Sequence, residues 1–147
     1  MFAWLELRTH CHATEDESKI EQVMAFLCPS VKSTKKKFEG YHKNPLLVFK
    51  SRTEKKKAIK EFWELLDSHG LVQSILQSME KRLDRENILH FRLGKQETYI
   101  GRPTLADDDD VVVVRLKVVA FSTKKRDMLD ATRDTITELI GKNVSDS

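Results

Sequence analysis

The sequence predicts an α+β domain, with a largely antiparallel sheet and helices packed on one of its faces, in the order β-α-β-β-α-α-β-β-α. Three observations predict this class. Several segments alternate apolar and polar residues, as strands with one buried face do. Other segments repeat apolar residues at helical spacing. Residues 40–45 (Gly-Tyr-His-Lys-Asn-Pro) form a turn between two strand-like segments, which predicts a β-hairpin and hence antiparallel pairing.

The size and composition of the chain predict one domain. At 147 residues, 39% apolar and 33% charged, it can bury a core without a disulfide or metal. We expect residues 1–142 to form that domain and residues 143–147 to be a frayed tail. No apolar run approaches the ~20 residues of a membrane span, and the apolar start meets Glu6 and Arg8 too soon for a secretory signal. With its two cysteines expected to be reduced, the chain is predicted to be cytoplasmic.

The first third of the chain predicts a strand, a helix and a hairpin. Residues 1–11 alternate, with the core face carrying Ala3, Leu5, Leu7, Thr9 and Cys11. Thr14 and Glu17 have capping-box spacing and begin a helix that Pro29 ends. Its predicted buried stripe is Ile20, Val23, Met24 and Leu27. Residues 31–39 and 46–52 are the predicted strands of the hairpin.

Two helices follow the hairpin. Thr53 can cap the first, whose predicted buried stripe is Ile59, Phe62, Trp63 and Leu66. Gly70 interrupts the helical pattern. Residues 71–83 then predict one further helix, with a buried stripe of Val72, Ile75, Leu76, Met79 and Leu83.

The remaining third predicts two strands and a final helix. Residues 87–93 form a strand with Leu89, Phe91 and Leu93 on one face, and residues 95–103 fit either a short helix or an irregular edge. After a turn at residues 107–110, the β-branched run over 111–121 is the clearest strand. Its predicted core face is Val112, Val114, Leu116, Val118 and Ala120. A helix over about 125–140 exits at Gly141, with its inward face formed by Leu129, Thr132, Ile136, Leu139 and Ile140.

Charge is concentrated in residues 32–60, which carry eleven basic residues and two acids against a net charge of +3 for the whole chain. Like charges this dense oppose compaction because they repel one another. They favour binding to phosphate, because neutralising each phosphate releases counterions. Lys55, Lys56 and Lys57 stand at a predicted helix start, where the dipole disfavours cations but an anion would be bound. The segment therefore predicts a nucleic-acid partner.

The second face of the predicted sheet points to the same partner. Aromatic rings interleaved with cations on a sheet are how several RNA-binding modules stack bases and hold phosphates. The residues expected there are Trp4, Arg8, His10, His12, His90, Arg92, Arg115, Lys117 and Phe121.

Metal and catalytic sites are weaker alternatives. His10 and His12 share a strand face and could ligate a metal with His42 or an aspartate, or be plain surface histidines. Asp107 to Asp110 could hold Mg²⁺ or be a loop that insulates a hydrophobic strand. The chain has no Gly-rich phosphate loop and no nucleophile with an evident base in sequence. We therefore predict no catalytic residue, no metal and no cofactor.

Three segments carry a resemblance to known proteins: residues 8–16 (Arg-Thr-His-Cys-His-Ala-Thr-Glu-Asp), 39–45 (Glu-Gly-Tyr-His-Lys-Asn-Pro) and 91–101 (Phe-Arg-Leu-Gly-Lys-Gln-Glu-Thr-Tyr-Ile-Gly). Together they resemble a family of small archaeal RNA-binding proteins described as predicted exosome subunits. The chain departs from the family pattern at Tyr41, Lys43 and Gly94. The resemblance implies a fold similar to the ribosomal large-subunit protein that binds 5S rRNA, and an RNA-binding role associated with RNA processing.

The leading hypothesis is a non-catalytic RNA-binding protein, acting as an accessory factor in RNA processing or degradation with the exosome, or related to the ribosome. The predicted RNA-binding residues are Arg8, His10, His12, Lys35, Lys36, Lys37, Tyr41, His42, Lys43, Lys50, Arg52, Lys55, Lys56, Lys57, Arg92, Lys95, Gln96, Arg115 and Lys117. One alternative is a protein-interaction or homodimer module. It would use the apolar members of the second face, Phe2, Trp4, Val113, Val119 and Phe121. The other is a metal-dependent hydrolase using His10, His12, His42 and the aspartates.

Overall fold

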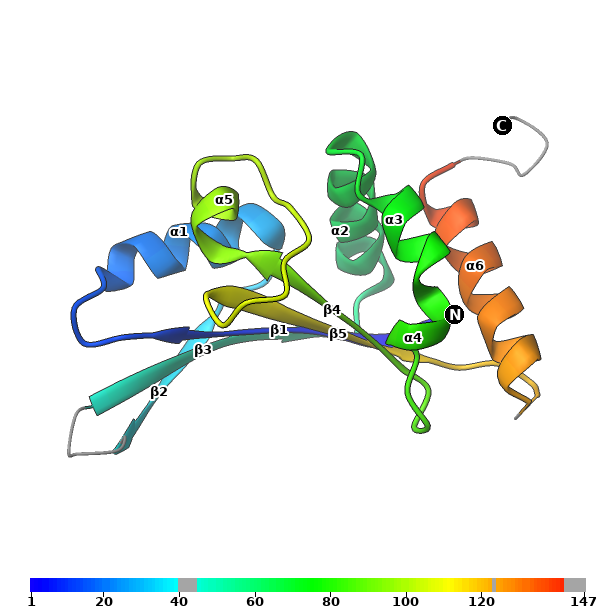
Figure 1. The fold of residues 1–147 in the computed structure, drawn as a ribbon, viewed down its shortest axis with the longest axis horizontal. Helices are drawn as coiled ribbons and strands as arrows, with labels where there is room; N and C mark the ends of the chain where they lie inside the picture. The colour runs from blue at the N-terminus through cyan, green and yellow to red at the C-terminus, as the bar shows by residue number, and fades with distance from the viewer. Residues whose placement is uncertain (40–44, 123, 142–147) are drawn as a thin grey trace.

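A computed structural model describes residues 1–39, 45–122 and 124–141 and confirms the α+β class (Figure 1). Five strands form one antiparallel sheet in the order β2-β3-β1-β5-β4. The strands are β1 (Phe2–Cys11), β2 (Thr34–Glu39), β3 (Pro45–Thr53), β4 (Ile88–Gly94) and β5 (Val111–Val118). The predicted hairpin is therefore confirmed as the β2–β3 pair.

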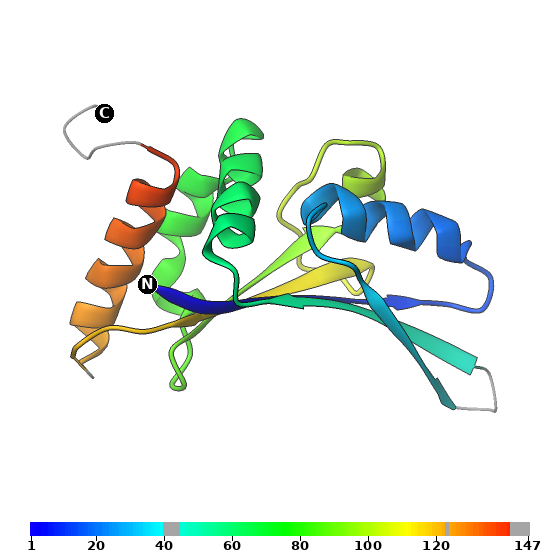
Figure 2. The ribbon, with the colours of Figure 1, turned by 180° about the vertical axis from the view of Figure 1, so that it is seen from behind.

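The helices cover one face of this sheet, and the described residues leave the other face open (Figures 1 and 2). They are α1 (Glu17–Leu27), α2 (Lys56–Ser68), α3 (Val72–Gln77), α4 (Met79–Arg82), α5 (Lys95–Tyr99) and α6 (Lys125–Leu139). The single helix predicted over residues 71–83 is two short helices that meet at Ser78. The ambiguous segment 95–103 contains a short helix, α5.

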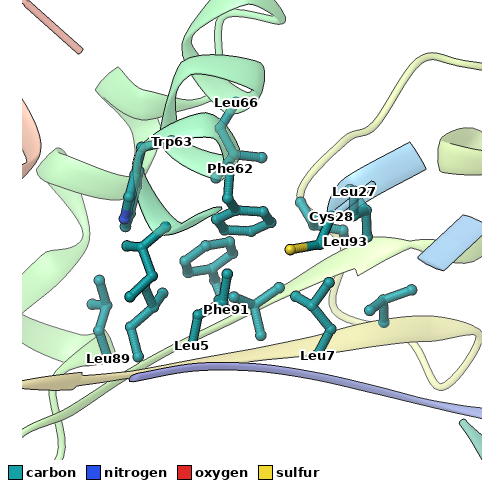
Figure 3. Close-up of a cluster of buried hydrophobic side chains, with 14 of the residues drawn as sticks. Leu5, Leu7, Leu27, Cys28, Phe62, Trp63, Leu66, Leu89, Phe91 and Leu93 are labelled. Atoms are coloured by element: carbon teal, nitrogen blue, oxygen red, sulfur yellow. The ribbon is translucent and has the colours of Figure 1, made fainter. Parts of the chain in front are cut away.

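The core lies between the helices and the sheet. Trp63 of α2 is fully buried, and its ring stacks on Phe2 at 5.6 Å between ring centroids. Phe62 and Phe91 stack at 6.3 Å between α2 and β4 (Figure 3). The stripes predicted for α1 and α2 are buried at every position, as are the predicted core residues of β4. In α6 the sequence missed Met128, which is buried beside Thr132 and Ile136.

Two local predictions at the start of the chain were wrong. A register shift between Phe2 and Trp4 reverses the alternation of β1, so Phe2 enters the core and Ala3 does not. Such a bulge adds one residue to one strand. The N-cap of α1 is Asp16, whose carboxylate accepts a hydrogen bond from the backbone N–H of Ser18 at 2.9 Å, and not Thr14.

The helix exits were predicted well. Gly70 and Gly141 follow α2 and α6 with φ of +74° and +71°, the left-handed backbone that glycine adopts easily after a helix. Most of the predicted turn, residues 40–44, and the tail 143–147 lie outside the described residues. No helix in the described part of the chain has the length and apolar character to cross a membrane.

Candidate nucleic-acid interface

The uncovered side of the sheet, called here the open face, is strongly basic. Strand register places the alternating residues of all five strands on this side. Its described strand residues include one carboxylate, Glu6, and seven cations. The cations are Arg8, Lys36, Lys50, Arg52, Arg92, Arg115 and Lys117. Because they come from every strand, only the folded sheet brings them together.

Glu6 organises the centre of the open face. Its side chain is only 5% exposed and forms three ion pairs, with Lys50 at 3.4 Å, Arg52 at 3.5 Å and Arg115 at 3.5 Å between nitrogen and oxygen. These cations come from β3 and β5, the two neighbours of β1 in the sheet. A single carboxylate neutralises only one of the three charges, so the cluster stays positive. The sequence did not single out Glu6 as a functional residue.

Trp4 lies beside this cluster and interacts with two of its cations. The Arg52 guanidinium carbon lies 4.4 Å from the centroid of the indole ring and that of Arg115 lies 5.7 Å from it, as in cation–π pairs. The indole thus helps to orient both guanidinium groups. Trp4 is half-buried, so it is less available as a bare base-stacking platform than the sequence implied.

The lysine run of β2 is divided between two sides of the sheet. Lys36 lies on the open face, where its ammonium is 5.3 Å from the ring centroid of Phe38, an aromatic side chain that is 40% exposed. Lys35 lies on the side of α1 and pairs with Glu17 at 3.0 Å. Lys37 shares that side and lines a cavity of about 390 Å³ between α1 and the hairpin. Phe38 is a stacking candidate that sequence reasoning missed.

Lys55, Lys56 and Lys57 are exposed at the start of α2, on the helix-covered side. The N-cap, Lys55, makes no side-chain capping hydrogen bond, and Thr53 instead accepts one from the Lys55 N–H at 3.0 Å. Leu47, which pairs with Lys37, lies about 20 Å along β3 from Thr53 at ~3.3 Å per residue. The basic segment was predicted as one region, but its cations lie in three places: on the open face, beside α1, and at the start of α2.

Lys95 and Gln96, predicted to contact RNA, form a network of contacts within the protein. The Lys95 side chain is 1% exposed, and its ammonium donates to the His10 carbonyl at 2.7 Å and to Glu15 at 3.0 Å. It also pairs with Asp110 at 3.1 Å. Gln96 donates to the same aspartate at 3.1 Å and accepts from Lys19. Burial opposes ionisation of Asp110, but these partners outweigh it and lower the Asp110 pKa.

His10 and His12 do not assemble a metal centre with the described residues. His10 lies on the open face beside Arg8, and its pKa is lowered by partial burial and by the neighbouring positive charges. The exposed His12 lies 4.0 Å from Glu15. Across residues 1–39, 45–122 and 124–141, no three His, Cys, Asp or Glu side chains gather as metal ligands would. His42, with Tyr41 and Lys43, lies outside the described residues.

The two cysteines are buried in the core, and burial raises the pKa of both thiols. A raised thiol pKa disfavours the reactive thiolate. Neither residue therefore adds a nucleophile to the site.

The chain belongs to the family described as RNA binding, which matches residues 4–118. An RNA-binding protein of Pyrococcus abyssi is 31% identical over 141 residues, with 88% of this chain and 90% of that protein covered. Membership of this family supports an RNA-binding function. Two of the three motifs, residues 8–16 and 91–101, contribute residues to the open face and to the Lys95 network, and residues 40–44 of the third lie outside the described residues.

Solved structures share the fold. A DUF54 protein from Archaeoglobus fulgidus matches with a TM-score of 0.81 at 28% identity, covering 91% of this chain and 99% of that one. A DUF54 protein from Methanothermobacter thermautotrophicus matches with a TM-score of 0.79 at 25% identity, covering 92% of this chain and 98% of that one. The match over nearly the whole of both relatives extends the likeness to α6, beyond the three motifs.

Proposed function

We propose that this protein binds RNA without chemistry of its own, and that it holds the RNA backbone on the open face. The single observation that carries the proposal is the assembly of seven cations from five strands on one face whose described strand residues include a single carboxylate. Phosphate is the ligand chemistry that such a surface fits, because each neutralised phosphate releases counterions. Phe38, exposed beside Lys36, would add base stacking at the hairpin.

The cellular setting rests on the resemblance stated from the motifs. RNA processing or degradation in the cytoplasm, with the exosome or other RNA-processing proteins as partners, fits a protein that grips RNA and brings no nucleophile to it. A relation to the ribosome through a fold like that of the 5S rRNA-binding protein is the other setting that the same motifs support.

The test compares two charge reversals of equal size. Arg8→Glu changes an exposed residue of the open face, and Lys60→Glu changes an exposed residue of α2 on the covered side. Binding of labelled single-stranded and duplex RNA is measured by fluorescence anisotropy at two salt concentrations. Arg8→Glu should weaken binding strongly and lower the salt dependence, by about 0.7 in slope for each phosphate of a single strand that is no longer neutralised. Equal affinities for the two variants would refute the open face as the RNA site.

A second candidate is self-association, supported by the exposed apolar residues that follow β5. Val119 is 46% exposed and Phe121 is fully exposed. Phe2, which the sequence placed on the same surface, lies instead in the core. Light scattering of the wild type and of Phe121→Glu separates the two candidates, because only a dimer that uses this surface would dissociate.

A further inference from the structure

A hollow of about 380 Å³ lies at the β4 edge of the open face. Its lining residues belong to α4 and the preceding Ser78, to β4 and β5, and to the segment that follows α5. The lining cations are Lys81, Arg82 and Arg92, joined by His90. Asp107 is the one acidic residue that lines it. Arg92 and His90 were predicted from the sequence to lie on this face, whereas Lys81 and Arg82 were not.

The hollow is continuous with the open face. Val113 lines it, and the same residue pairs with Arg8 of β1 on one side and with Arg92 of β4 on the other. Arg8 in turn pairs with Lys50. One row of the sheet therefore carries cations from β3, across β1, to the mouth of the hollow, a path of about 14 Å for three strand spacings of ~4.8 Å.

The loop between α4 and β4 is held in place by hydrogen bonds, and one of its partners, His90, lines the hollow. In Figures 1 and 2 this green loop projects below the sheet, away from the helices. Asp84 holds it by accepting from the N–H groups of Glu86 at 2.8 Å and Ile88 at 3.0 Å, and by pairing with His90 at 2.6 Å. Lys117 donates to the Glu86 carbonyl from β5. His90, one of the lining residues, is thus held in place by the fold itself.

We infer that this hollow is a nucleotide subsite, in which one phosphate-bearing nucleotide of the bound RNA lies at the edge of the sheet. The inference rests on the proposed function and adds the position of one nucleotide at the end of the row of cations. The volume is at the small end of ligand pockets, which suits a single nucleotide. Lys81, Arg82 and Arg92 would bind a phosphate, and Ala106 and Val113 would provide apolar lining for a base or sugar. The Arg82 Nε–H donates to Ser78 Oγ at 2.6 Å, which orients that guanidinium.

The experiment uses Lys81→Gln, because Lys81 is exposed and its replacement leaves α4 and the core intact. Lys60→Gln on α2 is the matched control. Anisotropy at two salt concentrations gives affinity and salt slope, and RNA carrying 4-thiouridine is photocrosslinked and the crosslinked peptides are mapped. Lys81→Gln should bind several-fold more weakly than Lys60→Gln, with a slope lower by about 0.7. Crosslinks in the wild type should fall on residues 78–82 or 105–107.

Superimposable binding curves for Lys81→Gln and Lys60→Gln, without crosslinks in those two segments, would overturn the subsite. Arg8→Glu, measured in the same series, reports separately on the proposed function. If Arg8→Glu weakens binding while Lys81→Gln does not, the open face binds RNA and the hollow does not. If Arg8→Glu binds as the wild type does, the proposed function itself fails.

Discussion

At the residue scale, Glu6 is a buried carboxylate at the centre of a surface that we propose binds the negatively charged RNA backbone. Three cations from neighbouring strands surround its carboxylate, and it holds them in place at the cost of one positive charge. Burying a carboxylate is unfavourable unless it is paired. The ion pairs that orient the cations therefore also offset the free-energy cost of burying the Glu6 carboxylate. Glu6 therefore stabilises the folded protein but reduces the positive charge that is available to RNA phosphates.

Replacing Glu6 with Gln should separate those demands. Without the carboxylate, the Lys50, Arg52 and Arg115 charges repel one another, so urea denaturation should show a lower free energy of unfolding. RNA affinity at low salt should rise, because three cations instead of two net charges are available to phosphate, with a salt slope steeper by about 0.7 for each additional phosphate neutralised. An RNA affinity that falls with the stability would show that Glu6 orients the cations more than it competes with phosphate.

Lys95 is a buried cation whose role is structural. Lys95→Met keeps the apolar stem but leaves Glu15 and Asp110 without their shared partner. Breaking a fully buried ion pair from one side costs about 3 kcal/mol. The Glu15 and Asp110 side chains are 18% and 46% exposed, so the loss of stability should be smaller, and thermal or urea unfolding would detect it. RNA affinity, measured where the variant is fully folded, should stay unchanged. Weakened binding with full stability would instead place Lys95 at the RNA.

Stability should fall in acid through Asp84 and Asp110. The pKa of each carboxyl is lowered in the folded chain: burial opposes ionisation, but hydrogen bonds from Ile88 and His90 at Asp84, and from Lys95 and Gln96 at Asp110, outweigh it. A depressed pKa contributes stability that is present above the ordinary value of about 3.9 and is lost as the pH falls through the folded value. The stability difference between wild type and Asp110→Asn should therefore be constant above about pH 5 and shrink below it.

Urea denaturation across that pH range provides the measurement. Asp108→Asn, an exposed neighbour in the same acidic run, is the matched control. A difference between wild type and Asp110→Asn that stays constant down to the lowest pH would contradict the assignment of the acid-sensitive stability to Asp110.

At the scale of the element, the hairpin β2–β3 offers two adjacent lysines on opposite sides of one strand. Lys36→Gln should weaken RNA binding, because Lys36 lies on the open face beside Phe38. Lys35→Gln should not, because its ammonium faces α1 and pairs with Glu17. An anisotropy titration of both variants provides the measurement. Equal losses of affinity would mean that the whole hairpin wraps around RNA, whichever side each lysine occupies.

Element periodicity predicted the buried stripes and the hairpin because each depends on local alternation. The register shift at Phe2 was not predictable from the local sequence. It places Phe2 against Trp63, which is distant along the chain. The break at Ser78 is equally hidden, because the apolar spacing of residues 71–83 continues across it. Lys95 looked like a surface cation because its partners, Glu15 and Asp110, are distant in sequence. The sequence therefore predicted which residues share the open face, but not the ion pairs that Glu6 and Lys95 form.

At the scale of the whole molecule, the candidate interface exists only when all five strands are paired. Arg8 and Lys117 stand far apart in the sequence but share the open face. RNA should therefore bind the folded chain much better than the unfolded chain, and at 100 times its Kd it should add about 2.7 kcal/mol to the free energy of unfolding. Thermal unfolding with and without RNA should show a rise in Tm at low salt that shrinks at high salt and in Arg8→Glu. An unchanged Tm would contradict specific binding to the folded sheet.

The one-sided covering of the sheet has a consequence for how such a protein can be varied. The helices lie on one side of the sheet (Figure 2). Burial and strand register place the core side chains on that side and the side chains proposed to contact RNA on the other. Substitutions at well-separated sites that share no partners usually combine additively. Away from Glu6, recognition could therefore be retuned strand by strand, by evolution or in the laboratory, while the helices continue to hold the sheet together.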